Sequence, residues 1–356
     1  MPVSGCTMLA VMLLLPPLLD AVLGLKLCPS RCLCDEPSDL VDCRSRGLVR
    51  VPPNVPHGIW LLDLSGNRLT EVHTRSFMGL WSLKILLMSN SSIQTLQPQC
   101  LSSLQFLERL DLSFNRLRWL PQDFSQRLSS LQELQLDHNL LQHLDSTSLG
   151  DFESLMKLDL SYNRIRAMDV GAFSRLSRLS LLNLTGNVLN VLKDGVLSRQ
   201  QRLEVLLLGH NNISLIETQA LAPLRSLTLF GLKGNQLEHI RFKTFLKLQT
   251  TSTHLQMSFN PWTCDCELQR VFSKIRHVRH LHVDDYKDIV CHAPLQQAGS
   301  LLASLDSQLC IAETASVLVI TITVMLAVIG TLIKAEHNRS KNKQTASDTD
   351  SERQER

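Results

Sequence analysis

Residues 107–117 read LERLDLSFNRL, and this stretch decides the fold. Leu110 and Leu112 alternate with Asp111, so the two leucines point to one side of a short strand and the aspartate points to the other. Asn115 follows where the strand ends, and its side-chain amide offers both donor and acceptor to buried backbone groups at a turn. The stretch therefore predicts a short strand that ends in an asparagine turn.

The same pattern recurs along the chain at a fixed period. Its asparagine position is occupied by Asn67, Ser91, Asn115, Asn139, Asn163, Asn187, Asn211, Asn235 and Asn260. The first eight of these residues are 24 positions apart, and the last follows after 25. Such a period predicts a solenoid, because no single repeat can bury its apolar face without a neighbour. Ser91 replaces asparagine in the second repeat, which predicts a weaker ladder of hydrogen bonds there.

The composition fits a core that is one stack of side chains deep. Hydrophobic residues make up 44% of the 356 residues, but aromatic residues only 5%. Leucines on the strands and one large apolar residue per turn, such as Phe77, Leu101 or Phe173, fill this core. A net charge of +3 is too small to indicate a nucleic-acid-binding protein.

The pattern is that of the leucine-rich repeat, which the chain resembles over most of its length. This resemblance implies an α/β-type solenoid, a curved horseshoe with one parallel β-strand per repeat. We expect eight repeats over residues 59–251. Residues 25–58 are expected to form an N-terminal cysteine-rich cap, and residues 252–311 a last partial repeat with a C-terminal cap.

Two apolar segments flank this region. Residues 8–19 are apolar but too short to span a membrane, so residues 1–24 are expected to be a signal peptide, with a signal anchor as the alternative. Residues 314–333 carry no charge and are long enough for one transmembrane helix. Lys334 and Arg339 follow it, which predicts a cytoplasmic tail over residues 334–356 and extracellular repeats at the plasma membrane.

Cysteines gather at both ends of the repeats, where a solenoid needs caps. Cys28, Cys32, Cys34 and Cys43 precede the first repeat, and Cys264, Cys266, Cys291 and Cys310 follow the last. Spacing alone allows three pairings in each group, and a zinc site is the rival interpretation.

The cysteine segments resemble the flanks of extracellular, Slit-like leucine-rich repeat proteins, as in the sequence NPWTCDC at residues 260–266 and CHAP at residues 291–294. That resemblance implies four disulfides and no metal: Cys28–Cys34, Cys32–Cys43, Cys264–Cys291 and Cys266–Cys310. Cys100 is left over within the repeats. We expect a partly buried free thiol there, with an intermolecular disulfide as the alternative.

The concave strand face is the expected binding surface. In repeats three to five, the column before the asparagines is aromatic, and charged residues lie beside it. Exposed aromatic side chains among charges are typical of protein interfaces, although rings beside the ladder also cover strand ends. The candidate ligand-binding residues are Glu108, Asp111, Phe114, Glu133, His138, Asp159 and Tyr162. Repeats six to eight present a more apolar face, which suggests a second contact surface or a dimer interface.

Three sequons predict glycosylation at Asn90, Asn183 and Asn212. Asn183 projects from the strand face, so we expect either that ligand contact avoids repeat six or that Asn183 is unmodified. The C-terminal cap carries a basic run between Arg270 and His282, which is a candidate site for sulfated glycan, although a solvated helix face also explains it.

The sequence predicts no enzyme and no cofactor, because no phosphate loop, nucleophile elbow or metalloprotease helix occurs in it. The layout of repeats, one span and a short tail resembles small "leucine-rich repeat and transmembrane" proteins and the leucine-rich auxiliary subunits of potassium channels. It implies a single-pass receptor or co-receptor that binds an extracellular protein ligand or a neighbouring membrane receptor. An auxiliary ion-channel subunit acting through its span and juxtamembrane segment is the alternative, and cell adhesion or matrix binding is the third hypothesis.

Overall fold

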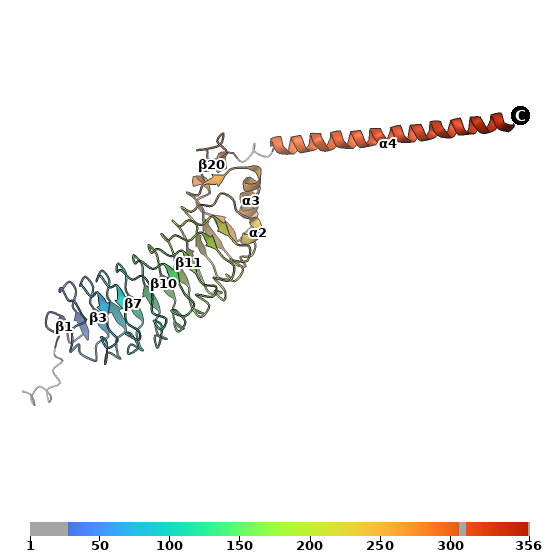
Figure 1. The fold of residues 1–356 in the computed structure, drawn as a ribbon. Helices are drawn as coiled ribbons and strands as arrows, with labels where there is room; N and C mark the ends of the chain where they lie inside the picture. Colours follow the sequence, from blue (N-terminus) through green and yellow to red (C-terminus); the bar gives the residue numbers. More distant parts are fainter. Residues whose placement is uncertain (1–27, 306–310, 355–356) are drawn as a thin grey trace, which may run out of the picture.

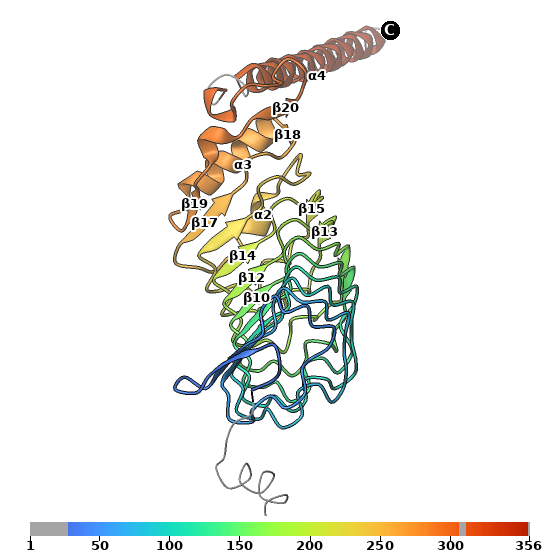
Figure 2. The same cartoon turned by 90° about the vertical axis from the view of Figure 1, so that its left-hand side faces the viewer.

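The computed structural model of the protein describes residues 28–305 and 311–354. Within these residues the chain winds into a curved solenoid with one continuous sheet along it (Figures 1 and 2). In spatial order, the sheet holds β1 (Leu33–Asp35), β2 (Leu40–Asp42), β3 (Leu61–Asp63), β5 (Ile85–Leu87), β7 (Arg109–Asp111), β8 (Glu133–Gln135), β10 (Lys157–Asp159), β12 (Leu181–Asn183), β14 (Val205–Leu207), β16 (Leu229–Gly231), β17 (Thr253–Gln256) and β19 (Leu281–Val283).

The strands pair in parallel and in register, except for β1 and β2, which pair antiparallel. Leu158 of β10 lies opposite Leu134 of β8 and Leu182 of β12, so equivalent positions of successive repeats align. The solenoid and its parallel strand in each repeat are confirmed.

Shorter two-stranded sheets lie elsewhere around the turns, where the sequence predicted no strands. Figure 2 shows β13 and β15 on another side of the solenoid from β12 and β14. These pairs are β4 (Glu71–Val72) with β6 (Thr95–Leu96), β9 (His143–Leu144) with β11 (Ala167–Met168), β13 (Val191–Leu192) with β15 (Leu215–Ile216), and β18 (Trp262–Thr263) with β20 (Cys291–Ala293).

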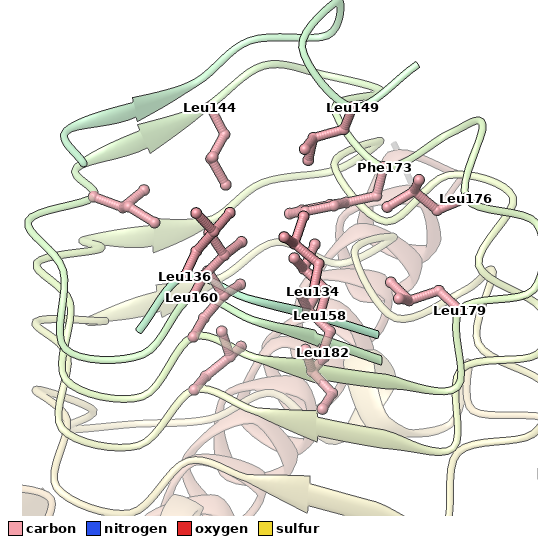
Figure 3. Close-up of a cluster of buried hydrophobic side chains, with 14 of the residues drawn as sticks. Leu134, Leu136, Leu144, Leu149, Leu158, Leu160, Phe173, Leu176, Leu179 and Leu182 are labelled. Atoms are coloured by element: carbon pink, nitrogen blue, oxygen red, sulfur yellow. The ribbon is translucent and has the colours of Figure 1, made fainter. Parts of the chain in front are cut away.

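The core is a stripe of aliphatic side chains, as the composition predicts. Figure 3 shows Leu134, Leu158 and Leu182 stacked along the solenoid axis, with Phe173 beside them. These side chains are fully buried. Burying one such side chain contributes roughly 1.5–3 kcal/mol, and each repeat does so only against its neighbours.

A ladder of buried asparagines joins the turns. The Asn115 amide nitrogen donates to the Met88 carbonyl of the preceding repeat at 2.9 Å, and also to the carbonyl of Leu112. Its amide oxygen accepts from the backbone N–H groups of Ser91 and Ile93. The later asparagines repeat this geometry, so each turn is fastened to the previous one by a buried side chain.

Ser91 preserves only part of this arrangement. Its hydroxyl donates to the Leu64 carbonyl at 3.0 Å and accepts from the Asn67 N–H at 3.3 Å. It does not reach the N–H of Leu69, which stands one repeat before Ile93 and would meet an asparagine oxygen. The ladder is therefore continuous but has fewer bonds at the second repeat.

The caps do more than cover the ends, because they add strands to the sheet. β1 and β2 extend it before the first repeat, and β19 extends it after the last. An open sheet edge exposes unpaired backbone groups, which explains why each cap provides a strand of its own. The sequence pattern predicted only the nine strands of the repeats.

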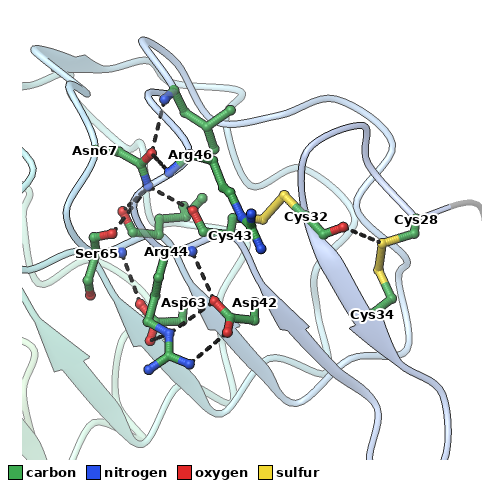
Figure 4. Close-up of a disulfide and its surroundings, with 12 residues drawn as sticks. Cys28, Cys32, Cys34, Asp42, Cys43, Arg44, Arg46, Asp63, Ser65 and Asn67 are labelled. Carbon is green, nitrogen blue, oxygen red and sulfur yellow. Dashed lines mark hydrogen bonds and ion pairs between the residues drawn. A yellow bond between two sulfur atoms is a disulfide. The ribbon is translucent and has the colours of Figure 1, made fainter.

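Disulfides fasten both caps. Cys28 is bonded to Cys34, Cys32 to Cys43 and Cys264 to Cys291, which are pairs that the resemblance implied. Cys266 is also disulfide-bonded, while its expected partner, Cys310, lies outside the described residues. In the N-terminal cap, shown in Figure 4, the Arg44 guanidinium contacts Asp42 at 2.7 Å and Asp63 at 3.5 Å. This contact lowers the pKa of the Asp42 carboxyl and ties the cap to the first repeat.

The helices lie at the C-terminal end. The short helix α2 (Phe242–Phe245) lies in the eighth repeat, and the cap contains α3 (Cys266–His277) and the 3-10 helices η1 (Tyr286–Asp288) and η2 (Leu302–Ser304). The long helix α4 (Ile311–Gln354) follows (Figure 1). Its residues Val317–Lys341 are long and apolar enough to cross a membrane and are not buried in the structure, so they form a candidate span that overlaps residues 314–333. The helix continues through most of the expected tail. The expected signal peptide lies outside the described residues.

We expect Ser91→Asn to stabilise the protein by about 1 kcal/mol, because the new amide oxygen would accept from the Leu69 N–H. Urea unfolding of the full chain in detergent, followed by circular dichroism, measures the change. Asn163→Ala is the matched destabilising variant, since it removes the partner of the Leu141 N–H and one of the two amide donors to the Leu136 carbonyl. It should lower the free energy of unfolding by roughly 2 kcal/mol or more. A Ser91→Asn protein no more stable than the parent would contradict this account of the ladder.

Candidate functional site

The outward side of the twelve-stranded sheet, called the sheet face below, presents the charged residues singled out from the sequence. Asp111, Glu133 and Asp159 lie on β7, β8 and β10, and Glu108 directly precedes β7. Because these strands are neighbours in register, the structure brings the four carboxylates onto one surface.

Internal contacts limit what these carboxylates offer a ligand. One oxygen of Asp111 accepts from the Ser113 backbone and hydroxyl, and Asp159 binds Ser161 in the same way. Glu108 forms an ion pair with Lys84 at 2.9 Å. Positively and negatively charged side chains on the sheet face are therefore held in place by internal contacts. The second oxygen of Asp111 is still available to a ligand.

Phe114, His138 and Tyr162 form one continuous stack beside this face. The ring centroids of Phe114 and His138 are 4.1 Å apart, and those of His138 and Tyr162 are 4.6 Å apart. The outer two residues are 54% and 52% exposed. The stack therefore offers a rigid aromatic surface that crosses three repeats.

The backbone under the stack is strained. All three residues have φ between 51° and 54°, a left-handed conformation that costs a residue with a side chain roughly 1–2 kcal/mol. A stacked aromatic pair contributes about 0.5–1.5 kcal/mol, so two pairs offset only part of the strain of three residues. At the equivalent position, Gly66, Gly186 and Gly234 avoid the strain, whereas Asn90, His210 and Phe259 have a similar left-handed φ with a side chain. Repeats three to five differ from the others because three successive side chains at this position are rings that stack on one another.

The stack ends at Gly186 for a steric reason. A side-chain carbon added to this glycine would lie 2.7 Å from the Tyr162 ring. Glycine in repeat six therefore leaves room for the last ring, and its φ of 71° is one that glycine adopts without strain.

Asp137 and His138 connect the stack to the sheet face. The Asp137 carboxylate lies 2.9 Å from the His138 Nδ1 atom. Burial raises the pKa of the Asp137 carboxyl, the hydrogen bond from His138 opposes that rise, and the charge of Asp159 adds to it. The contact fixes the central ring of the stack in one orientation.

Sequence reasoning missed a second aromatic surface, on the flank where the strands begin. Trp81 is 61% exposed and Phe106 is 55% exposed, and both line a shallow groove with Lys84 and Glu108. The sequence contained a signal for this surface. At the positions equivalent to Trp81 and Phe106, the other repeats have small or polar residues. Glu108 lies between this groove and the sheet face, so the two surfaces are close neighbours.

The apolar residues expected on repeats six to eight do lie on the sheet face. Leu181, Val205, Leu207 and Leu229 are half-buried there. Leu207 also covers Gly231, where an added side-chain carbon would lie 3.2 Å from its methyl group. A dimer interface at this surface stays a prediction.

The sequons differ in accessibility. Asn90 and Asn212 are exposed, whereas Asn183 is half-buried on β12. The amide nitrogen of Asn183, which would carry a glycan, donates to Asp159 at 3.0 Å. Glycosylation of Asn183 would break this contact with a candidate ligand-binding residue, and its occupancy stays open.

Cys100 is a buried free thiol with 3% exposure. Burial in apolar surroundings raises its pKa to about 12, so the thiol is uncharged and unreactive at neutral pH. A buried sulfur cannot reach another chain without local unfolding, which argues against the alternative of an intermolecular disulfide.

Two side chains of the basic run in the C-terminal cap already contact aromatic rings. The Arg276 guanidinium lies over the Tyr286 ring at 4.4 Å, and Lys274 lies over the Phe242 ring at 5.8 Å. In the described residues, no group of His, Cys, Asp and Glu side chains has the arrangement of a metal site. Glycan binding at this cap remains a prediction.

Comparison with known proteins places these features in a family. The leucine-rich repeat pattern matches residues 60–117, 105–165, 129–189 and 182–237. A stretch of 70 residues is 39% identical to leucine-rich repeat-containing protein 3 of Danio rerio and covers 19% of this chain. The matched stretch spans only 26% of that relative, so the likeness concerns repeats rather than the whole protein.

Solved structures share the fold over a larger part of the chain. Human 5T4, the trophoblast glycoprotein, superposes with a TM-score of 0.62 at 23% identity, covering 80% of this chain and 98% of its own. A chain in the octameric complex of latrophilin 3, Unc5D and the repeat protein FLRT2 superposes with a TM-score of 0.58 at 25% identity, covering 80% of this chain and 99% of its own.

We expect His138→Gly to leave the free energy of unfolding within about 1 kcal/mol of the parent value, because relief of the left-handed strain offsets the lost stacking. Gly186→Ala is the matched control, since its added carbon is both strained and too close to Tyr162, and it should destabilise by at least ~1 kcal/mol. Urea unfolding of the full chain measures both. A loss above about 3 kcal/mol for His138→Gly would show that the stack is a structural element.

Proposed function

Since the chain belongs to the leucine-rich repeat family, we propose that it is a single-pass cell-surface receptor or co-receptor that binds protein ligands through the sheet face. The observation that carries this proposal is the strained, half-exposed stack of Phe114, His138 and Tyr162. Rigid aromatic side chains lose little entropy on binding and are the residues in which interface energy concentrates.

The charged residues around the stack supply the polar part of the interface. Glu108, Asp111, Glu133 and Asp159 lie on the strand side of the aromatic stack, so polar and apolar groups adjoin there as they do in protein interfaces. Their internal contacts hold these side chains in place before binding, so they lose little conformational entropy when a ligand binds. The Trp81 and Phe106 groove extends the same surface past Glu108.

The candidate span Val317–Lys341 supports attachment to a membrane. The basic residues at its end, beginning with Lys334, favour a cytoplasmic C-terminus, which leaves the repeats and both disulfide caps outside the cell. Signalling would then pass through a neighbouring membrane protein, and the complex of FLRT2 with latrophilin 3 and Unc5D is an example of repeat proteins in such assemblies.

The proposal gives the chain no catalytic role. The sheet face is an open surface, and catalysis by side chains generally needs a site that excludes water. Repeat proteins of this kind typically act by binding.

Exchange of the span and tail for an unrelated membrane anchor separates this proposal from its rivals. Cells that display the full chain or the exchanged chain are incubated with a panel of soluble ectodomains of membrane proteins. We expect the same ectodomains to bind both chains, and Phe114→Gly combined with Tyr162→Gly to weaken that binding about tenfold or more while surface display is unchanged. Val170→Ser, an exposed apolar residue away from the stack, is the control and should bind like the parent.

If the chain regulates an ion channel and this regulation is lost when the native span is exchanged, the result would instead support an auxiliary channel subunit. Ectodomain binding that survives both glycine substitutions would contradict a role for the stack.

A further inference from the structure

The loops that lead into β12 and β14 carry a group of exposed arginines. Arg175, Arg178 and Arg199 line one shallow groove, called the arginine groove below, together with the small residues Gly150, Ser154, Ser174 and Ser177. Glu153 is the one carboxylate among the described residues that line it. No ion pair forms to any of these arginines within the described residues.

The repeat sets the spacing of these charges. Arg199 follows Arg175 by one 24-residue turn, and the exposed Arg202 follows Arg178 in the same way. Neighbouring turns are about 4.8 Å apart at the sheet. The positive charges therefore form two short rows along the solenoid axis, instead of converging on one point.

This arrangement suits a polymer better than a small anion. A single exposed ion pair contributes little free energy, so one small anion would bind weakly to any of these guanidinium groups. A chain with regularly spaced anionic groups makes several such contacts at once, and their effects combine because the later contacts are intramolecular. The small residues leave the guanidinium groups accessible along the groove.

We propose that the arginine groove binds a sulfated polysaccharide. Guanidinium groups bind oxyanions through paired hydrogen bonds, and a sulfated polysaccharide presents permanently charged oxyanions at regular intervals along one chain, which matches the rows of arginines. This inference rests on the proposed function in one respect, since it needs the repeats to be outside the cell, where sulfated polysaccharides occur. It places a glycan site on the flank of repeats four to six and not at the C-terminal cap, where Arg276 and Lys274 already lie on aromatic rings.

The test uses immobilised heparin as the probe and the purified full chain in detergent. The groove variant combines Arg175→Gln, Arg178→Gln and Arg199→Gln. The cap variant combines Arg270→Gln, Lys274→Gln and Arg279→Gln. It removes three positive charges from exposed positions, the same number as the groove variant. Circular dichroism checks that both variants are folded. Soluble heparin, unsulfated hyaluronan and polyglutamate are compared as competitors.

We expect the groove variant to bind heparin about tenfold more weakly or worse, and the cap variant to stay within about twofold of the parent. Soluble heparin should compete, while hyaluronan and polyglutamate should not. Equal losses in the two variants would show attraction by net charge alone and would overturn the proposal, as would unchanged binding of the groove variant or competition by polyglutamate. The ectodomain panel, applied to the groove variant, reports separately on the sheet face, so failure here is distinguishable from failure of the proposed function.

Discussion

The structure depends on one constraint, which is that no turn of the solenoid can bury its own apolar face. Leu110 is shielded only because the strands on either side present Leu86 and Leu134 in register. The buried amide of Asn115 provides the matching polar contact, since it satisfies backbone groups of its own turn and of the turn before. Where the repeats stop, this constraint is met by the strands and disulfides of the caps.

Because the inward positions are fixed by stacking, function must reside in the outward ones. The position before each asparagine is left-handed in many repeats, and glycine or asparagine is the least strained choice there. His210 and Phe259 also depart from that choice, but Phe114, His138 and Tyr162 of repeats three to five follow one another and stack, and their strain exceeds what their mutual stacking contributes. The flank also has outward positions that depart from the repeat pattern, because exposed tryptophan and arginine replace small or polar residues of the other repeats. We infer a functional role for these positions as well.

The period of the sequence made the strands, the asparagine turns and the leucine core predictable, because many in-register copies support each position. Single-copy features were harder to predict. β1, β2 and β19 are three residues long and have no repeat to support them, so the extension of the sheet into the caps was not foreseen. The aromatic column was noticed, but its stacking and strain depend on backbone angles. Trp81 and Arg178 were missed because only the strand face and the C-terminal cap were considered as surfaces.

The most direct test of ligand binding at the sheet face is a glycan placed upon it. Leu87→Asn creates a sequon with Ser89 on β5, beside Asp111 of β7 and at the repeat position where the chain already carries Asn183. Mass spectrometry of the surface-displayed full chain establishes its occupancy, and ectodomain binding is then measured with and without enzymatic glycan removal. The account predicts that binding is blocked by the glycan and recovers when it is removed. Full binding by the fully glycosylated chain would contradict it.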